Sequence, residues 1–76
     1  MKEKLNKIFI KHFSINIKKI ENSNINNTEK WDSFSHINLI LDIEEKFKLK
    51  KIKPSKIANL TSYKACYKYI ITEQSR

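Results

Sequence analysis

Apolar side chains recur at helical spacing in three segments of this 76-residue chain, and that periodicity constrains its fold most. Residues 2–14 place Leu5, Ile8 and Phe9 on one side and lysines on the other, which is the pattern of an amphipathic helix. Residues 33–48 repeat this spacing, as does the segment after Thr61 with Tyr63, Cys66 and Ile70, and no segment carries the signal of a β-strand. The sequence therefore predicts an all-α fold.

Residues that start and stop helices set the expected boundaries. Asp32 is a good N-cap for the helix over 33–48, and Thr61 is expected to cap the last helix. Proline at the start of 54–59 can open a short helix, since its fixed φ suits the first helical position. Three longer helices and one short one make a small four-helix bundle, a single domain over residues 1–76.

Two apolar rows run along the expected helix 33–48. The first consists of Leu39, Ile40, Ile43 and Phe47, and the second of Phe34, Ile37 and Leu41. One row can pack inward while the other borders a cavity or a partner.

The segment before that helix is polar. Residues 21–28 are rich in Asn and Ser, which favour turns, so we expect a long loop there. Trp31 is expected to pin this loop onto the bundle. In the last helix, the single cysteine, Cys66, excludes an internal disulfide and is expected to be a small buried side chain.

The net charge of +8 would ordinarily suggest a nucleic-acid or anionic-membrane partner. Its distribution weakens that interpretation, because residues 29–45 hold five acidic residues and one lysine, a net −4 against +12 elsewhere. The chain has 15 Lys, 13 Ile and 8 Asn, so part of the lysine excess can reflect an AT-rich genome. The longest apolar runs have three residues, which predicts that there is no membrane span or signal peptide. We therefore expect a cytoplasmic protein, and we expect it to be a monomer.

The order of motifs resembles the acyl carrier protein family over nearly the whole chain. The matching motifs are Asp32-Ser33-Phe34, Glu44-Glu45-Lys46-Phe47 and the segment that begins Leu60-Thr-Ser-Tyr-Lys-Ala. In that family, the Ser of an Asp-Ser-Leu motif carries a covalent 4′-phosphopantetheine arm. A helix N-terminus suits such a phosphate, because its free N–H groups carry partial positive charge. Phe34 replaces the usual Leu, and the Lys46–Lys56 tract departs from a region that is usually acidic in the family.

The resemblance implies a role for each residue around Ser33. A separate phosphopantetheinyl transferase would attach the arm from coenzyme A to Ser33, and Asp32 would help to orient that complex. The chain itself would be a non-catalytic carrier of acyl groups, holding no metal, in fatty-acid or specialised polyketide-type biosynthesis. The partner-docking face would consist of Phe34, Ile37, Leu41, Glu44 and Glu45.

Other classes of function stay open. A Ser33–His36–Asp32 hydrolase lacks a Gly-rich elbow and an oxyanion loop, so we expect His36 on a polar face near the arm instead. The lysine tract 46–56 would suit a small nucleic-acid-binding bundle, but from Lys48 onward no aromatic residue is interleaved to stack on bases. A basic helix 2–14 lying on a membrane and a carrier-like adaptor without an arm are further alternatives.

Overall fold

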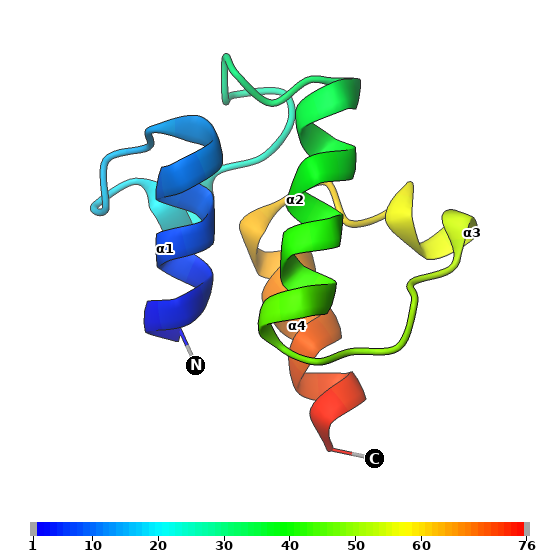
Figure 1. The fold of residues 1–76 in the computed structure, drawn as a ribbon. Helices are drawn as coiled ribbons and strands as arrows, with labels where there is room; N and C mark the ends of the chain where they lie inside the picture. Colours follow the sequence, from blue (N-terminus) through cyan, green and yellow to red (C-terminus); the bar gives the residue numbers. More distant parts are fainter. Residues whose placement is uncertain (1, 76) are drawn as a thin grey trace.

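The computed structural model describes residues 2–75, and within them the chain is mostly helical (Figure 1). The α-helices are α1 (Lys2–Phe13), α2 (Ser33–Lys46), α3 (Pro54–Ile57) and α4 (Tyr63–Gln74), with a 3-10 turn η1 (Ile20–Asn22). This part of the chain contains no β-strand, only an isolated bridge between Asn24 and Ser62. The predicted all-α bundle of three longer helices and one short helix is confirmed. None of these helices has the length and apolar character needed to cross a bilayer.

The three longer helices bury one shared core. Its fully buried members include Leu5 and Phe9 of α1, Leu39 and Ile40 of α2, and Ile70 of α4. Cys66 of α4 is buried among them, as expected. Burial raises the pKa of its thiol to about 12, because a thiolate is costly in apolar surroundings.

Aromatic rings join the long loop to α1, and join α1 to α4. Phe9 makes edge contacts with Trp31 at 5.4 Å and with Tyr63 at 5.1 Å between ring centroids. Phe13 stacks on Trp31 at 4.7 Å. Trp31 is 3% exposed, so the expectation that it pins the loop onto the bundle is confirmed.

The loop between α1 and α2 is ordered by its asparagine side chains. Asn24 Oδ1 accepts hydrogen bonds from the backbone amides of Asn26 and Asn27, while the side chain of Asn27 accepts one from the amide of Asn24. Two backbone bonds then tie this loop to the start of α4: Ile25 N–H donates to Thr61, and Tyr63 N–H donates to Ser23. The loop therefore has a defined conformation despite its length.

The start of α4 differs by one residue from the prediction. Ser62, not Thr61, is the N-cap, because the Ser62 hydroxyl accepts a hydrogen bond from the Ala65 amide at 3.1 Å. Thr61 instead pairs with the loop, where its carbonyl accepts the bond from the Ile25 amide. Both residues are suitable caps by type, so tertiary pairing decides between them.

The helix ends must form without glycine, which the chain lacks entirely. Ser14 and Lys48, just after α1 and α2, both adopt φ of 53°, a left-handed conformation that usually selects Gly. After α2, the Lys48 amide donates to Glu45 and the Leu49 amide to Glu44, which is the Schellman arrangement. A non-glycine residue in this conformation costs about 1–2 kcal/mol.

The connection from α2 to α3 is anchored by Glu44. One carboxylate oxygen of Glu44 accepts a hydrogen bond from the backbone amide of Ile52 at 2.6 Å. The side chain of Ile52 is 1% exposed and belongs to the core. This lysine-rich connection is therefore held in place by the ionic hydrogen bond of Glu44 and by the buried side chain of Ile52.

Replacing Lys48 by Gly is expected to stabilise the protein by about 0.5–1 kcal/mol, since it removes the left-handed penalty at the end of α2 while loosening the unfolded chain. The free energy of unfolding in urea measures the gain. Lys50→Gly is the matched control: it removes the same charge from the same connection, where φ is not positive, and should not stabilise. Equal gains in both variants would trace the effect to lost lysine repulsion instead.

Candidate functional site

Ser33 is the first residue of α2 and is exposed to solvent. The residue before it, Asp32, caps the helix as predicted, because its side chain accepts a hydrogen bond from the Ser35 amide at 2.9 Å. Hydrogen bonds from the backbone and the side chain of Ser35 lower the pKa of Asp32. The structure thus presents an accessible hydroxyl beside an exposed carboxylate that is ionised at neutral pH.

A row of exposed apolar side chains begins beside Ser33. Phe34 is 78% exposed, Ile37 is 49% exposed and Leu41 is 55% exposed, whereas Ile40, on another face of α2, is 1% exposed. The expected division of α2 into an inward row and an outward row is therefore what the structure contains. Single exposed apolar residues are common, but three in one helical row beside an accessible hydroxyl form a candidate contact surface.

His36 does not belong to this surface, so the expectation of a polar, exposed residue there is wrong. It is 8% exposed, and its Nδ1 accepts a hydrogen bond from the indole N–H of Trp31 at 3.0 Å. Its other nitrogen, Nε2, lies 2.8 Å from the Ile57 carbonyl, which can only accept, so Nε2 carries the proton. Both nitrogens are engaged, which leaves no free lone pair to activate Ser33 as a hydrolase would require.

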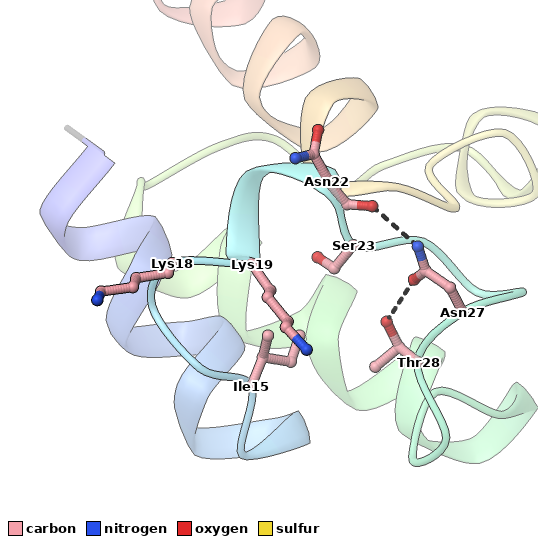
Figure 2. A pocket seen from close by; sticks show the side chains of 7 residues that line it. All are labelled: Ile15, Lys18, Lys19, Asn22, Ser23, Asn27 and Thr28. Carbon is pink, nitrogen blue, oxygen red and sulfur yellow. Dashed lines mark hydrogen bonds between the residues drawn. The ribbon is translucent and has the colours of Figure 1, made fainter.

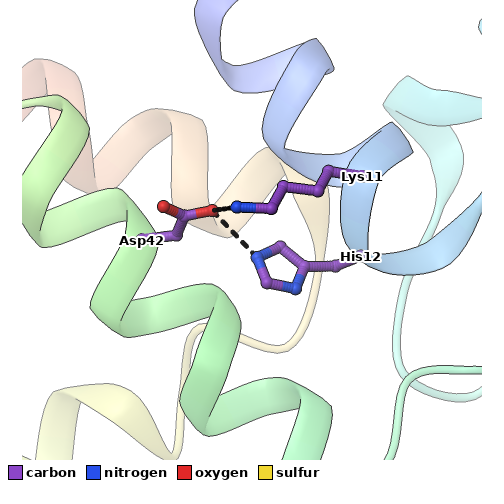
Figure 3. Close-up of polar contacts among 3 residues, drawn as sticks. All are labelled: Lys11, His12 and Asp42. Carbon is purple, nitrogen blue, oxygen red and sulfur yellow. Dashed lines mark hydrogen bonds and ion pairs between the residues drawn. The ribbon is translucent and has the colours of Figure 1, made fainter.

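The acidic residues of α2 have different environments. Glu45 is exposed, as a docking carboxylate would have to be, while Glu44 is half-buried and binds the Ile52 amide. Asp42 faces α1, where its Oδ2 lies 3.0 Å from His12 Nε2 and 3.4 Å from Lys11 Nζ (Figure 3). Of the two glutamates proposed for the partner face, Glu44 uses its carboxylate in a structural hydrogen bond, while the Glu45 side chain is exposed.

The Asp42 carboxylate forms a partly buried ionic contact between α1 and α2. Burial raises its pKa, but the hydrogen bond from His12 and the charge and hydrogen bond of Lys11 outweigh this and lower the pKa overall. Sequence patterning missed the contact because His12 and Asp42 lie 30 residues apart. The only sign of this contact in the sequence is that His12 and Asp42 each lie beside apolar residues of their helices.

A pocket of about 380 Å³ opens in the loop between α1 and α2 (Figure 2). Its polar groups bond within the loop: Ser23 donates to the Ile20 carbonyl, and Thr28 donates to the side chain of Asn27. Lys18 and Lys19 also line it. Ser33 is not among its lining residues. Within residues 2–75, no group of three or more His, Cys, Asp or Glu side chains could hold a metal ion.

Comparison with known proteins does not identify a family for this chain. No model of a known protein family matches the chain, and no curated protein matches it. The candidate site therefore consists of Ser33, Asp32 and the exposed row of Phe34, Ile37 and Leu41, with Glu45 at its far end.

The two rows of α2 should respond oppositely to truncation. Ile40→Ala should lower the free energy of unfolding by about 2–5 kcal/mol, because it opens a cavity in the core. Ile37→Ala, the matched variant on the exposed row, should change it by less than about 0.5 kcal/mol. Thermal and urea unfolding measure both values. A large loss from Ile37→Ala would mean that this row supports the core and is not free to contact a partner.

Asp42→Asn should destabilise the protein by about 1–2 kcal/mol at pH 7, since it removes a charge-assisted contact to His12 and Lys11. The folded-state pKa of Asp42 lies below the ordinary 3.8, so on acidification the unfolded chain takes up this proton first. The stabilisation is full above pH 3.8 and is lost as the pH falls through the folded-state value. Urea unfolding at several pH values should therefore show the difference between wild type and Asp42→Asn narrowing in that range. A constant difference down to about pH 2 would contradict this role.

Proposed function

We propose that this protein is an acyl carrier whose 4′-phosphopantetheine arm is attached to Ser33. A phosphopantetheinyl transferase would transfer the arm to the Ser33 oxygen by breaking the diphosphate bond of coenzyme A, with release of adenosine 3′,5′-bisphosphate. That enzyme would supply the metal and the base that takes the hydroxyl proton. The arm then carries an acyl group as a thioester between partner enzymes of fatty-acid or specialised polyketide-type biosynthesis. The protein would have the acyl-carrier type of fold and would act as a cytoplasmic monomer.

The observation that carries the proposal is the exposed Ser33 hydroxyl at the first position of α2, at the head of an exposed apolar row. Phosphate attached there would sit at the positive end of a 14-residue helix. The hydroxyl can accept a large group without any change in the core, because Ser33 is exposed to solvent.

The neighbouring residues support the same chemistry. Asp32 keeps its carboxylate exposed and ionised next to Ser33 while capping the helix, so it can contact a transferase or its metal without leaving the cap. Phe34, Ile37 and Leu41 supply an apolar contact area for partner enzymes, and Glu45 supplies a charge at its end. Because that area is mainly apolar, its loss should weaken the docking of partner enzymes at any salt concentration.

Incubation with coenzyme A, magnesium and a broad-specificity phosphopantetheinyl transferase should add one phosphopantetheine mass, read by intact mass spectrometry. Ser33→Ala should abolish the gain while the protein stays folded, since Ser33 is exposed and the cap of α2 is Asp32. Ser35→Ala is the matched control, because Ser35 lies in the same helical turn and should leave loading intact.

Two outcomes would contradict the carrier proposal. Persistence of the mass gain in Ser33→Ala would place the arm elsewhere on the chain. Absence of any gain with several transferases, on protein shown by circular dichroism to be helical, would favour the adaptor that carries no arm.

A further inference from the structure

The connection between α2 and α3 forms, with α4, a pocket of about 280 Å³ that is dominated by lysine. Its lining comprises Lys50, Lys51, Lys53 and Lys56 together with Tyr69 and Glu73. The four lysines are all exposed, and none of them forms an ion pair with another residue in 2–75. Four positive charges and one negative charge therefore surround a single hollow.

The backbone that carries these lysines is anchored by buried and hydrogen-bonded residues. Ile52, between Lys51 and Lys53, is buried in the core and its amide is held by Glu44. The Lys53 carbonyl accepts bonds from the amides of Lys56 and Ile57 in α3. The lysine Cα positions are therefore set before any ligand binds, which lowers the ordering cost of binding.

This arrangement is unfavourable for the protein alone. Two like charges a few Å apart repel by about 1 kcal/mol even in water, and no carboxylate offsets most of them here. Genome composition explains a high number of lysines, but it does not explain four of them around one cavity on an anchored segment. A multivalent anion would remove the repulsion and would stabilise the folded state by mass action.

We propose that this pocket binds a small phosphate-rich anion, of the size and charge of a diphosphate group. Its volume matches that of about nine water molecules in the liquid, and a diphosphate has a similar number of non-hydrogen atoms. Ammonium groups on flexible stems suit such an ion, because each can turn to meet a phosphate oxygen. The proposal does not depend on the function proposed for Ser33.

The surroundings favour a small anion over a membrane or a nucleic acid. None of the strongly exposed large apolar side chains described above lies in the 46–56 tract, so an apolar anchor for lipid insertion is missing there. Tyr69 is the only aromatic residue that lines the pocket, and it is half-buried against the core, which gives little surface on which bases could stack.

The test is a titration of the ¹⁵N-labelled full chain with inorganic pyrophosphate, followed by NMR at constant ionic strength. Amide shifts should saturate and should concentrate in residues 50–57 and 69–73. Uniform shifts over all lysine-bearing surfaces, or shifts that do not saturate at low millimolar pyrophosphate, would overturn the proposal.

Two quadruple variants separate the site from general charge. Lys50, Lys51, Lys53 and Lys56 are changed to Gln in one, and Lys18, Lys19, Lys30 and Lys64 are changed to Gln in the other. Both lose four charges and retain a net +4 from the original +8. The dissociation constant for pyrophosphate should rise about tenfold in the first and less than about twofold in the second. Equal weakening would reduce the effect to net charge and contradict a built site.

Vesicles of anionic phospholipid and a single-stranded oligonucleotide complete the test. Little binding of either at a salt concentration where pyrophosphate binds would support a site for a small anion. Tighter binding of vesicles or oligonucleotide, dependent on the same four lysines, would contradict the proposal. It would show that the ligand is a membrane surface or a nucleic acid and not a small anion.

Discussion

Burial of the Phe9 ring is the interaction on which the rest of the structure depends. Phe9 comes from α1, while the rings at its edges, Trp31 and Tyr63, come from the long loop and from α4. Edge-to-face contacts of this kind add about 0.5–1.5 kcal/mol to the burial of each ring. Since Trp31 immediately precedes Asp32 and Ser33, this packing also sets where α2 begins and where its first hydroxyl is presented.

From Trp31 the same constraint passes to α3. The indole N–H holds His36, and His36 holds the carbonyl of Ile57 at the end of α3. One buried imidazole thus links the loop, α2 and the short helix, with every polar atom satisfied. The charges of the chain are also separated along the sequence. The acidic residues cluster in 29–45, around Ser33, and the lysines cluster in 46–56.

Much of this could be predicted from the sequence, and the exceptions share a cause. Helical spacing predicted the helices and both rows of α2, and the residue type of Asp32 predicted its cap. The polarity of His36 favours an exposed face, but its place four residues before buried Ile40 puts it on the inward side of α2. The bonds of Glu44 to Ile52 and of Asp42 to His12 join residues from different segments, and no local pattern encodes such pairs. The role of Ser33 as an arm attachment site rests on resemblance and remains a prediction.

The contact between the first and last helices affects how the chain can fold. Tyr63 donates its hydroxyl hydrogen bond to Asn6 at 2.6 Å across 57 residues of sequence, and the same ring closes over Phe9. Contacts of such long sequence separation require a loop to close before they are gained, which slows folding. A nascent chain that ends before α4 would leave Phe9 without one of its covering rings, so the bundle cannot complete its core until α4 has been synthesised.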